Sequence, residues 1–143
     1  HQNVLARVDI ATPHIAGYSF DGKVRATQML KDLFCDFFEF ENQLEKEVKL
    51  SGLELDIDSS GDTRDVVCRA ILAAYPISKD DEGLRQAEAM NDAELAAHFD
   101  ALRKNYWQRR EFSQYTVLIS ADCSDATQKM LAACGFNLAL KGQ

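Results

Sequence analysis

The chain has little proline, little glycine and no long apolar run. Two of its 143 residues are proline and seven are glycine, while 46% are hydrophobic; this composition excludes a disordered chain and predicts a packed core. No stretch reaches the roughly 18 apolar residues that a membrane span requires. The first residues, His1-Gln2-Asn3, also lack the basic and apolar regions of a signal peptide. We expect one domain, or one domain plus a piece of another, with no membrane partner.

An excess of basic charge is missing as well. The formal net charge is −7, and nonspecific binding to nucleic acid or to an anionic membrane needs a basic protein surface. We therefore expect no nucleic-acid partner. This balance still allows one local basic site.

Closely spaced cysteines are also absent. The four cysteines are Cys35, Cys68, Cys123 and Cys134, and no pair has CxxC spacing. The three histidines lie far from them in sequence, so we expect no metal site. We interpret the cysteines as small buried thiols on apolar faces, typical of a reducing cytoplasm.

Two elements are expected before residue 45. The apolar run Val8 to Ala11 predicts a strand. Apolar residues at three- and four-residue steps predict a helix over 22–40, with Ser19 as its N-cap and Asp21 adding negative charge in its first turn. The phenylalanine-rich end of this helix is interpreted as core. An alternative is that it packs on a domain outside this chain or on a second subunit.

The remainder predicts an α+β arrangement in the order β, two or three helices, β, α, β, which is β-α-α-β-α-β when the weak helix is not counted. Capping patterns and breakers set several boundaries: a capping box from Asn91 to Glu94, a stop at Pro76 and a glycine C-cap at Gly135. The expected strands cover 48–57 (with a bend at Gly52), 115–120 and 136–140, and the expected helices cover about 62–75, weakly 79–89, from 92 onwards, and about 123–134. A unit this small favours a partner surface.

A candidate proton-transfer group lies in Thr12-Pro13-His14-Ile15-Ala16-Gly17-Tyr18. Histidine is the only unperturbed side chain whose charge changes near neutral pH, which suits it to move a proton on and off an alcohol. Pro13 restricts the backbone before His14, and Gly17 allows a close approach to a ligand. A structural hydrogen-bonding role for His14 is the alternative.

A basic cluster is expected in the C-terminal half of the helix that starts near residue 92. It comprises Arg103, Lys104, Arg109 and Arg110. These charges suit the negative end of a helix dipole on a solvated face. The alternative is that Arg109 or Arg110 crosses a dimer interface to bind a substrate phosphate, since guanidinium binds phosphate in a bidentate manner.

Several blocks together resemble one family. The segment TPHIAGYSFDGKVRAT is similar to the part of the D-isomer-specific 2-hydroxyacid dehydrogenases that carries their acid–base histidine. Leu102-Arg103-Lys104-Asn105-Tyr106, the following RREF and the tail CGFN resemble, in the same order, the C-terminal domain of members that act on a phosphorylated four-carbon acid. The histidine segment alone indicates the superfamily, and the later blocks make the resemblance specific.

The resemblance implies roles for individual residues. His14 would accept the C2 hydroxyl proton while hydride passes to NAD. Gly17 would lie against the nicotinamide end of NAD, and Tyr18 would contact the phosphorylated substrate, 4-phospho-D-erythronate. The family's substrate-binding Arg, its His-orienting Glu and its glycine-rich dinucleotide loop precede this segment, and no GxGxxG motif occurs here.

The same resemblance implies a domain organisation. Residues 1–45 would be the end of the Rossmann-type NAD and substrate domains (strand, loop and crossing helix), and 46–143 a small α/β sandwich dimerisation domain. The expected whole is a cytoplasmic homodimer active in vitamin B6 biosynthesis, with the 143 residues inactive alone. The alternatives are a non-catalytic homodimerisation module, a dehydrogenase for another 2-hydroxy acid, and a small-ligand regulatory domain of an unrelated enzyme.

Overall fold

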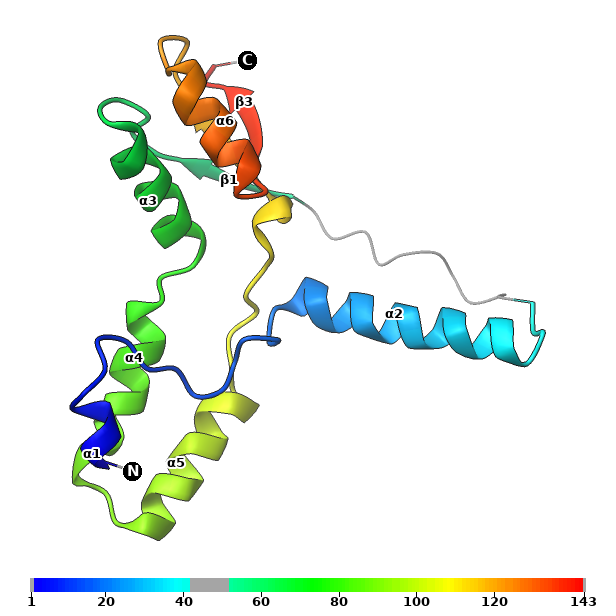
Figure 1. The fold of residues 1–143 in the computed structure, drawn as a ribbon, viewed down its shortest axis with the longest axis vertical. Helices are drawn as coiled ribbons and strands as arrows, with labels where there is room; N and C mark the ends of the chain where they lie inside the picture. Colours follow the sequence, from blue (N-terminus) through cyan, green and yellow to red (C-terminus); the bar gives the residue numbers. More distant parts are fainter. Residues whose placement is uncertain (1, 42–51, 143) are drawn as a thin grey trace. The chain divides into compact units, whose positions relative to one another are not determined.

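A computed structural model describes residues 2–41 and 52–142 of the chain, in two compact units (Figure 1). One unit comprises His1–Ala16 and Tyr75–Gln108, and the other comprises Gly17–Ala74 and Arg109–Gln143. The boundary expected at residue 45 lies outside the described residues and stays a prediction. So does the N-terminal part of the strand expected over 48–57.

The second unit contains a three-stranded parallel sheet. Its strands β1 (Leu53–Asp56), β2 (Tyr115–Ile119) and β3 (Asn137–Leu140) lie in the order β1-β2-β3. The helices α3 (Thr63–Ala74) and α6 (Asp125–Ala133) pack against each other, α3 also contacts β1 and α6 contacts β3 (Figure 1). The α+β class predicted from the sequence is confirmed, and from residue 53 on this unit follows the chain order β-α-β-α-β. The helices predicted over about 79–89 and from 92 onwards belong to the other unit.

The core of this unit forms because three elements each present one apolar face. Alternate residues of the central strand, Tyr115, Val117 and Ile119, are buried, as expected for the period of two of a strand with one covered face. They meet the apolar faces of α3 and α6, among them Val66 and Leu131, which are fully buried. The Tyr115 hydroxyl donates to the carbonyl of Ala74 at 3.3 Å, and burial raises the pKa of this phenol.

Local capping chemistry sets several helix boundaries, although the helix predicted over 22–40 ends at Phe37. Ser19 caps α2 (Phe20–Phe37) by accepting from the backbone N–H of Gly22, and Ser124 caps α6 by accepting from that of Thr127. Gly135 follows α6 with φ of +97°, a conformation that favours glycine. The short 3-10 turn η2 (Phe112–Gln114) leads into β2.

The helix α2 does not join a core, in contrast to the main interpretation of its sequence. No residue of α2 is buried, and Leu30, Leu33 and Phe37 are each more than 60% exposed. The apolar positions do share one helix face, but no described element packs against it. The phenylalanine rings contact one another instead, with 4.6 Å between the ring centroids of Phe34 and Phe38.

The first unit is helical. It contains α1 (Gln2–Leu5), α4 (Ser78–Arg85), the 3-10 helix η1 (Gln86–Ala89) and α5 (Asp92–Lys104). The capping box at the start of α5 is present in full. His98 of α5 bonds locally, with 2.8 Å between its Nε2 and the carbonyl oxygen of Gly83. No described helix is both long and apolar enough to cross a membrane.

Three expectations from the sequence are corrected. Residues 8–11 form no strand, because their backbone groups bond to side chains of α4 rather than to a neighbouring strand. Arg109 and Arg110 lie beyond the helix of the basic cluster, which ends at Lys104 with Asn105 as its C-cap. The four cysteines are free thiols, but only Cys123 is buried as predicted: Cys35 and Cys134 are half-buried and Cys68 is exposed.

Candidate active-site segment around His14

The backbone around His14 places an exposed imidazole between two buried neighbours. Pro13 and Ile15 are buried, and Ile15 is only 2% exposed, whereas His14 is exposed. His14 has φ of +59°, and its N–H donates to the carbonyl of Thr12 at 2.8 Å. This left-handed conformation is energetically unfavourable for a residue other than glycine. The left-handed turn at His14 is therefore flanked by two buried residues.

Gly17 and Tyr18 begin the second unit. Gly17 is exposed, and a Cβ built on it meets no atom within 4 Å. Internal packing of the described chain therefore does not require glycine there, so the open backbone fits the close approach of a ligand. Tyr18 is half-buried, and the Nζ of Lys23 lies 4.1 Å from the centroid of its ring.

The two predicted arginines lie beside the segment that follows Tyr18. Both are 9% exposed. The carbonyl of Arg109 accepts from the backbone N–H of Phe20 at 2.8 Å. Arg110 donates through Nε to both carboxylate oxygens of Asp21, at 3.0 Å each. Arg109 and Arg110 therefore lie at the N-terminus of α2, within one unit. The guanidinium of Arg110 forms an ion pair with Asp21 there.

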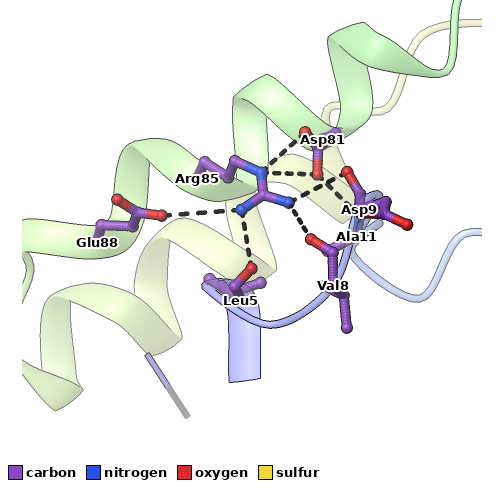
Figure 2. A network of polar contacts seen from close by, with 7 residues as sticks. All are labelled: Leu5, Val8, Asp9, Ala11, Asp81, Arg85 and Glu88. Atoms are coloured by element: carbon purple, nitrogen blue, oxygen red, sulfur yellow. Dashed lines mark hydrogen bonds and ion pairs between the residues drawn. The ribbon is translucent and has the colours of Figure 1, made fainter. Parts of the chain in front are cut away.

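A second polar network, in the first unit, holds the segment before His14 (Figure 2). Arg85 of α4 donates to the carboxylate of Asp81 and to the carbonyls of Leu5 and Val8, all within 3.0 Å. The backbone N–H of Ala11 donates to Asp81 at 2.8 Å. The bond from Arg85, followed by the bond from Ala11, lowers the pKa of the Asp81 carboxyl.

A cavity of about 370 Å³ opens beside Pro13 in the same unit. Asp80, His98, Tyr106 and Trp107 contribute to its lining. Asp80 is only 8% exposed, and one of its carboxylate oxygens accepts from the hydroxyls of Tyr75 and Tyr106 at 2.7 and 2.9 Å. These two bonds stabilise a buried carboxylate and fix the wall of the cavity.

Histidine, cysteine, aspartate and glutamate are the side chains that could hold a metal ion. Within 2–41 and 52–142, no group of three or more such residues is placed to hold a metal ion.

Comparison with known proteins matches more than half of the chain to one family. Residues 49–135 match the family described as "Domain of unknown function (DUF3410)". The chain belongs to this family.

Curated relatives extend the match to the histidine segment. The chain is 37% identical over 133 residues to an erythronate-4-phosphate dehydrogenase of Teredinibacter turnerae, covering 92% of this chain and 33% of the relative. It is 39% identical over 114 residues to one from Acinetobacter baumannii (80% and 32% covered) and 36% identical over 145 residues to one from Photorhabdus laumondii (96% and 35% covered). The chain spans about a third of the length of these relatives. The resemblance predicted from the sequence blocks is confirmed.

Sequence reasoning missed the residues of α4 that hold the histidine segment. Asp81 and Arg85 have the four-residue spacing of a helical ion pair, and this spacing is the one local pattern that could have indicated that the two residues pair. Their partners lie 70 to 80 residues earlier in the chain, and no local pattern indicates a contact of that range.

Proposed function

We propose that this chain supplies the acid–base histidine and the dimerisation module of an NAD-dependent dehydrogenase. The proposed reaction oxidises 4-phospho-D-erythronate at C2 to 3-hydroxy-2-oxo-4-phosphobutanoate, a step in pyridoxal phosphate biosynthesis. The observation that carries it is the exposed His14, held at φ of +59° between buried neighbours, in a segment within the match to relatives named erythronate-4-phosphate dehydrogenase.

Three residues of the chain would have separate roles around the C2 hydroxyl of the substrate. His14 accepts the hydroxyl proton as the C2 hydrogen leaves with its electron pair and the C2–O bond becomes a carbonyl. NAD, when bound, accepts that hydride. Gly17 presents the open backbone against which the nicotinamide end would lie, and Tyr18 would contact the substrate. The remaining cofactor contacts require residues other than these, since the sequence has no GxGxxG motif.

An assay of NADH absorbance with the full natural gene product tests this proposal. We expect turnover of 4-phospho-D-erythronate and much weaker turnover of unphosphorylated D-erythronate. His14→Asn should lower kcat by about 10²- to 10⁴-fold, the usual contribution of a general acid–base group. Ala16→Asn, at an exposed neighbouring position, is the matched control. An unchanged kcat in His14→Asn would contradict the proposal.

Arg109 or Arg110 is further proposed to bind the substrate phosphate. Their position beside the segment that follows Tyr18 supports this assignment. Arg110 would have to share its guanidinium between Asp21 and the phosphate. Loss of the phosphate-binding arginine should raise the KM for the phosphorylated substrate, and unchanged KM values in both Arg109→Ala and Arg110→Ala would contradict the assignment.

The proposed assembly is a cytoplasmic homodimer formed through residues 46–143. Four free thiols are consistent with a reducing compartment, and a sandwich of this size favours a partner surface. Light scattering of the full gene product should give twice the mass of one chain. A monomeric mass at working concentration would contradict the homodimer without affecting the role of His14.

A further inference from the structure

The segment that carries His14 is held by side chains rather than by regular secondary structure. Between Leu5 and Phe20 the described chain contains neither helix nor strand. Two backbone hydrogen bonds in this stretch close local turns, from the N–H of Arg7 to the carbonyl of Val4 and from the N–H of His14 to the carbonyl of Thr12. Backbone polar groups need partners, so the contacts that fix this segment on α4 decide where it lies.

One arginine binds three successive parts of the segment (Figure 2). The Nη1 of Arg85 donates to the carbonyl of Leu5 at 2.9 Å, and its Nη2 donates to the carbonyls of Val8 at 2.9 Å and Asp9 at 3.4 Å. Its Nε donates to Asp81, whose Oδ1 accepts from the N–H of Ala11. The Arg85–Asp81 pair therefore holds both donors and acceptors of residues 5–11.

The physical character of these bonds makes the pair a firm anchor. Every one of them involves a charged group, and charge-assisted hydrogen bonds are roughly twice as strong as neutral ones. The side chains of Arg85 and Asp81 are 27% and 17% exposed, so solvent competes only in part. The planar fork of arginine suits several oxygens at once, which lysine cannot reproduce.

The anchor acts close to His14. Ala11 is three residues before His14 in the chain, so even an extended backbone separates them by at most about 10 Å. Within that stretch, buried Pro13 has its φ fixed by its ring. A shift of Ala11 would therefore be passed on to the left-handed turn at His14.

We propose that Arg85 and Asp81 are positioning residues that set the placement of the His14 imidazole for proton transfer. The inference rests on the proposed acid–base role of His14. Loss of the anchor keeps the His14 side chain in the protein but allows the backbone that carries it to shift. Displacement of a reacting group by about 1 Å can cost on the order of 10²-fold in rate.

The test compares Arg85→Met with Glu88→Gln in the full natural gene product. Glu88 pairs with the same guanidinium from its solvent side, with 3.9 Å between its Oε1 and the Nη1 of Arg85, and its side chain is 57% exposed. We expect Arg85→Met to lower kcat by roughly 10- to 100-fold with little change in either KM, and Glu88→Gln to retain the wild-type kcat. Hydrogen exchange at the amide of Ala11 should accelerate in Arg85→Met alone.

A double variant separates positioning from a general loss of stability. If Arg85 acts through His14, adding Arg85→Met to His14→Asn should cause no further loss of the residual rate, since residues that act as a unit are not additive. Wild-type kcat in Arg85→Met, or the same fold loss in both backgrounds, would overturn the inference. Where Arg85→Met fails to fold, Asp81→Asn replaces it, with the same expected pattern and a smaller loss.

Failure of this inference differs from failure of the proposed function. An active His14→Asn variant would refute the acid–base role itself. Inactive His14→Asn together with fully active Arg85→Met and Asp81→Asn would refute only the positioning role.

Discussion

Arg110 donates through its Nε to both carboxylate oxygens of Asp21, at 3.0 Å each, across 89 residues of sequence. The backbone N–H of Glu111 donates to the same carboxylate at 2.8 Å, and the Nη2 of Arg110 donates to the side chain of Gln114 at 3.1 Å. Both charged side chains are largely buried, at 9% and 15% exposure. This cluster joins the first turn of α2 to the segment that enters β2.

Removal of the Asp21 charge should therefore destabilise the chain. Asp21→Asn keeps the shape but leaves a largely buried guanidinium without its counter-charge, which we expect to lower the free energy of unfolding by about 1–3 kcal/mol. Asp36→Asn, at an exposed position of the same helix, should change it by less than about 0.5 kcal/mol. Urea unfolding measures both, and equal effects of the two substitutions would contradict the role assigned to the pair.

Local patterns predicted those parts of the fold whose physics is local. The apolar stripe of α3 and the alternating buried residues of β2 can be recognised from their sequence periods. The helix caps at Ser19, Asn91 and Gly135 depend on residues only a few positions away. The class and element order of the sheet unit follow from these signals.

Contacts between distant residues decided the rest. The apolar residues 8–11 are typical of a strand, but Arg85 and Asp81 bind the backbone there. Arg109 and Arg110 fit a basic helix end by composition, yet Asn105 ends the helix before them. For the candidate site, the sequence predicts His14 as the proton-transfer residue. It does not predict the left-handed backbone of His14 or the anchor of its segment on α4, because both depend on tertiary contacts.

Strain at His14 gives a prediction about tolerated substitutions. At φ of +59°, asparagine is accommodated well and a β-branched residue poorly. We expect His14→Val to be less stable than His14→Asn by about 1–2 kcal/mol. The same pair at Ala16, which is not among the positive-φ positions, should show a much smaller gap. Urea unfolding of the four variants measures the two differences, and similar gaps at both positions would exclude strain as the cause.

The cysteines should react in an order set by exposure. Cys68 is exposed, whereas Cys123 is buried and has its pKa raised by burial and then by the nearby charge of Asp122. Because the thiolate is the reactive form, iodoacetamide should modify Cys68 first and Cys123 last, as followed by peptide mass spectrometry. In urea this order should disappear. Early modification of Cys123 in the folded chain would contradict its placement in the core.

The pH dependence of the Arg85–Asp81 anchor has a definite sign. The bonds from Arg85 and from the Ala11 N–H lower the pKa of Asp81 below its ordinary value of 3.8 in the folded chain. The unfolded chain then binds this proton more readily, so the carboxylate stabilises the fold above pH 3.8, and the contribution is lost as pH falls through the lowered folded value.

Carbon-13 NMR of the Asp81 carboxyl tests that sign directly. The midpoint in the wild-type chain should lie below 3.8, and Arg85→Met should move it upward, since it removes the largest cause of the shift. Glu88→Gln keeps the Arg85–Asp81 bond and should leave the midpoint low. Protection of the Ala11 amide should be lost over the same acidic range as the carboxyl titrates. A wild-type midpoint at or above 3.8 would show that Arg85 does not hold the Asp81 carboxylate in solution.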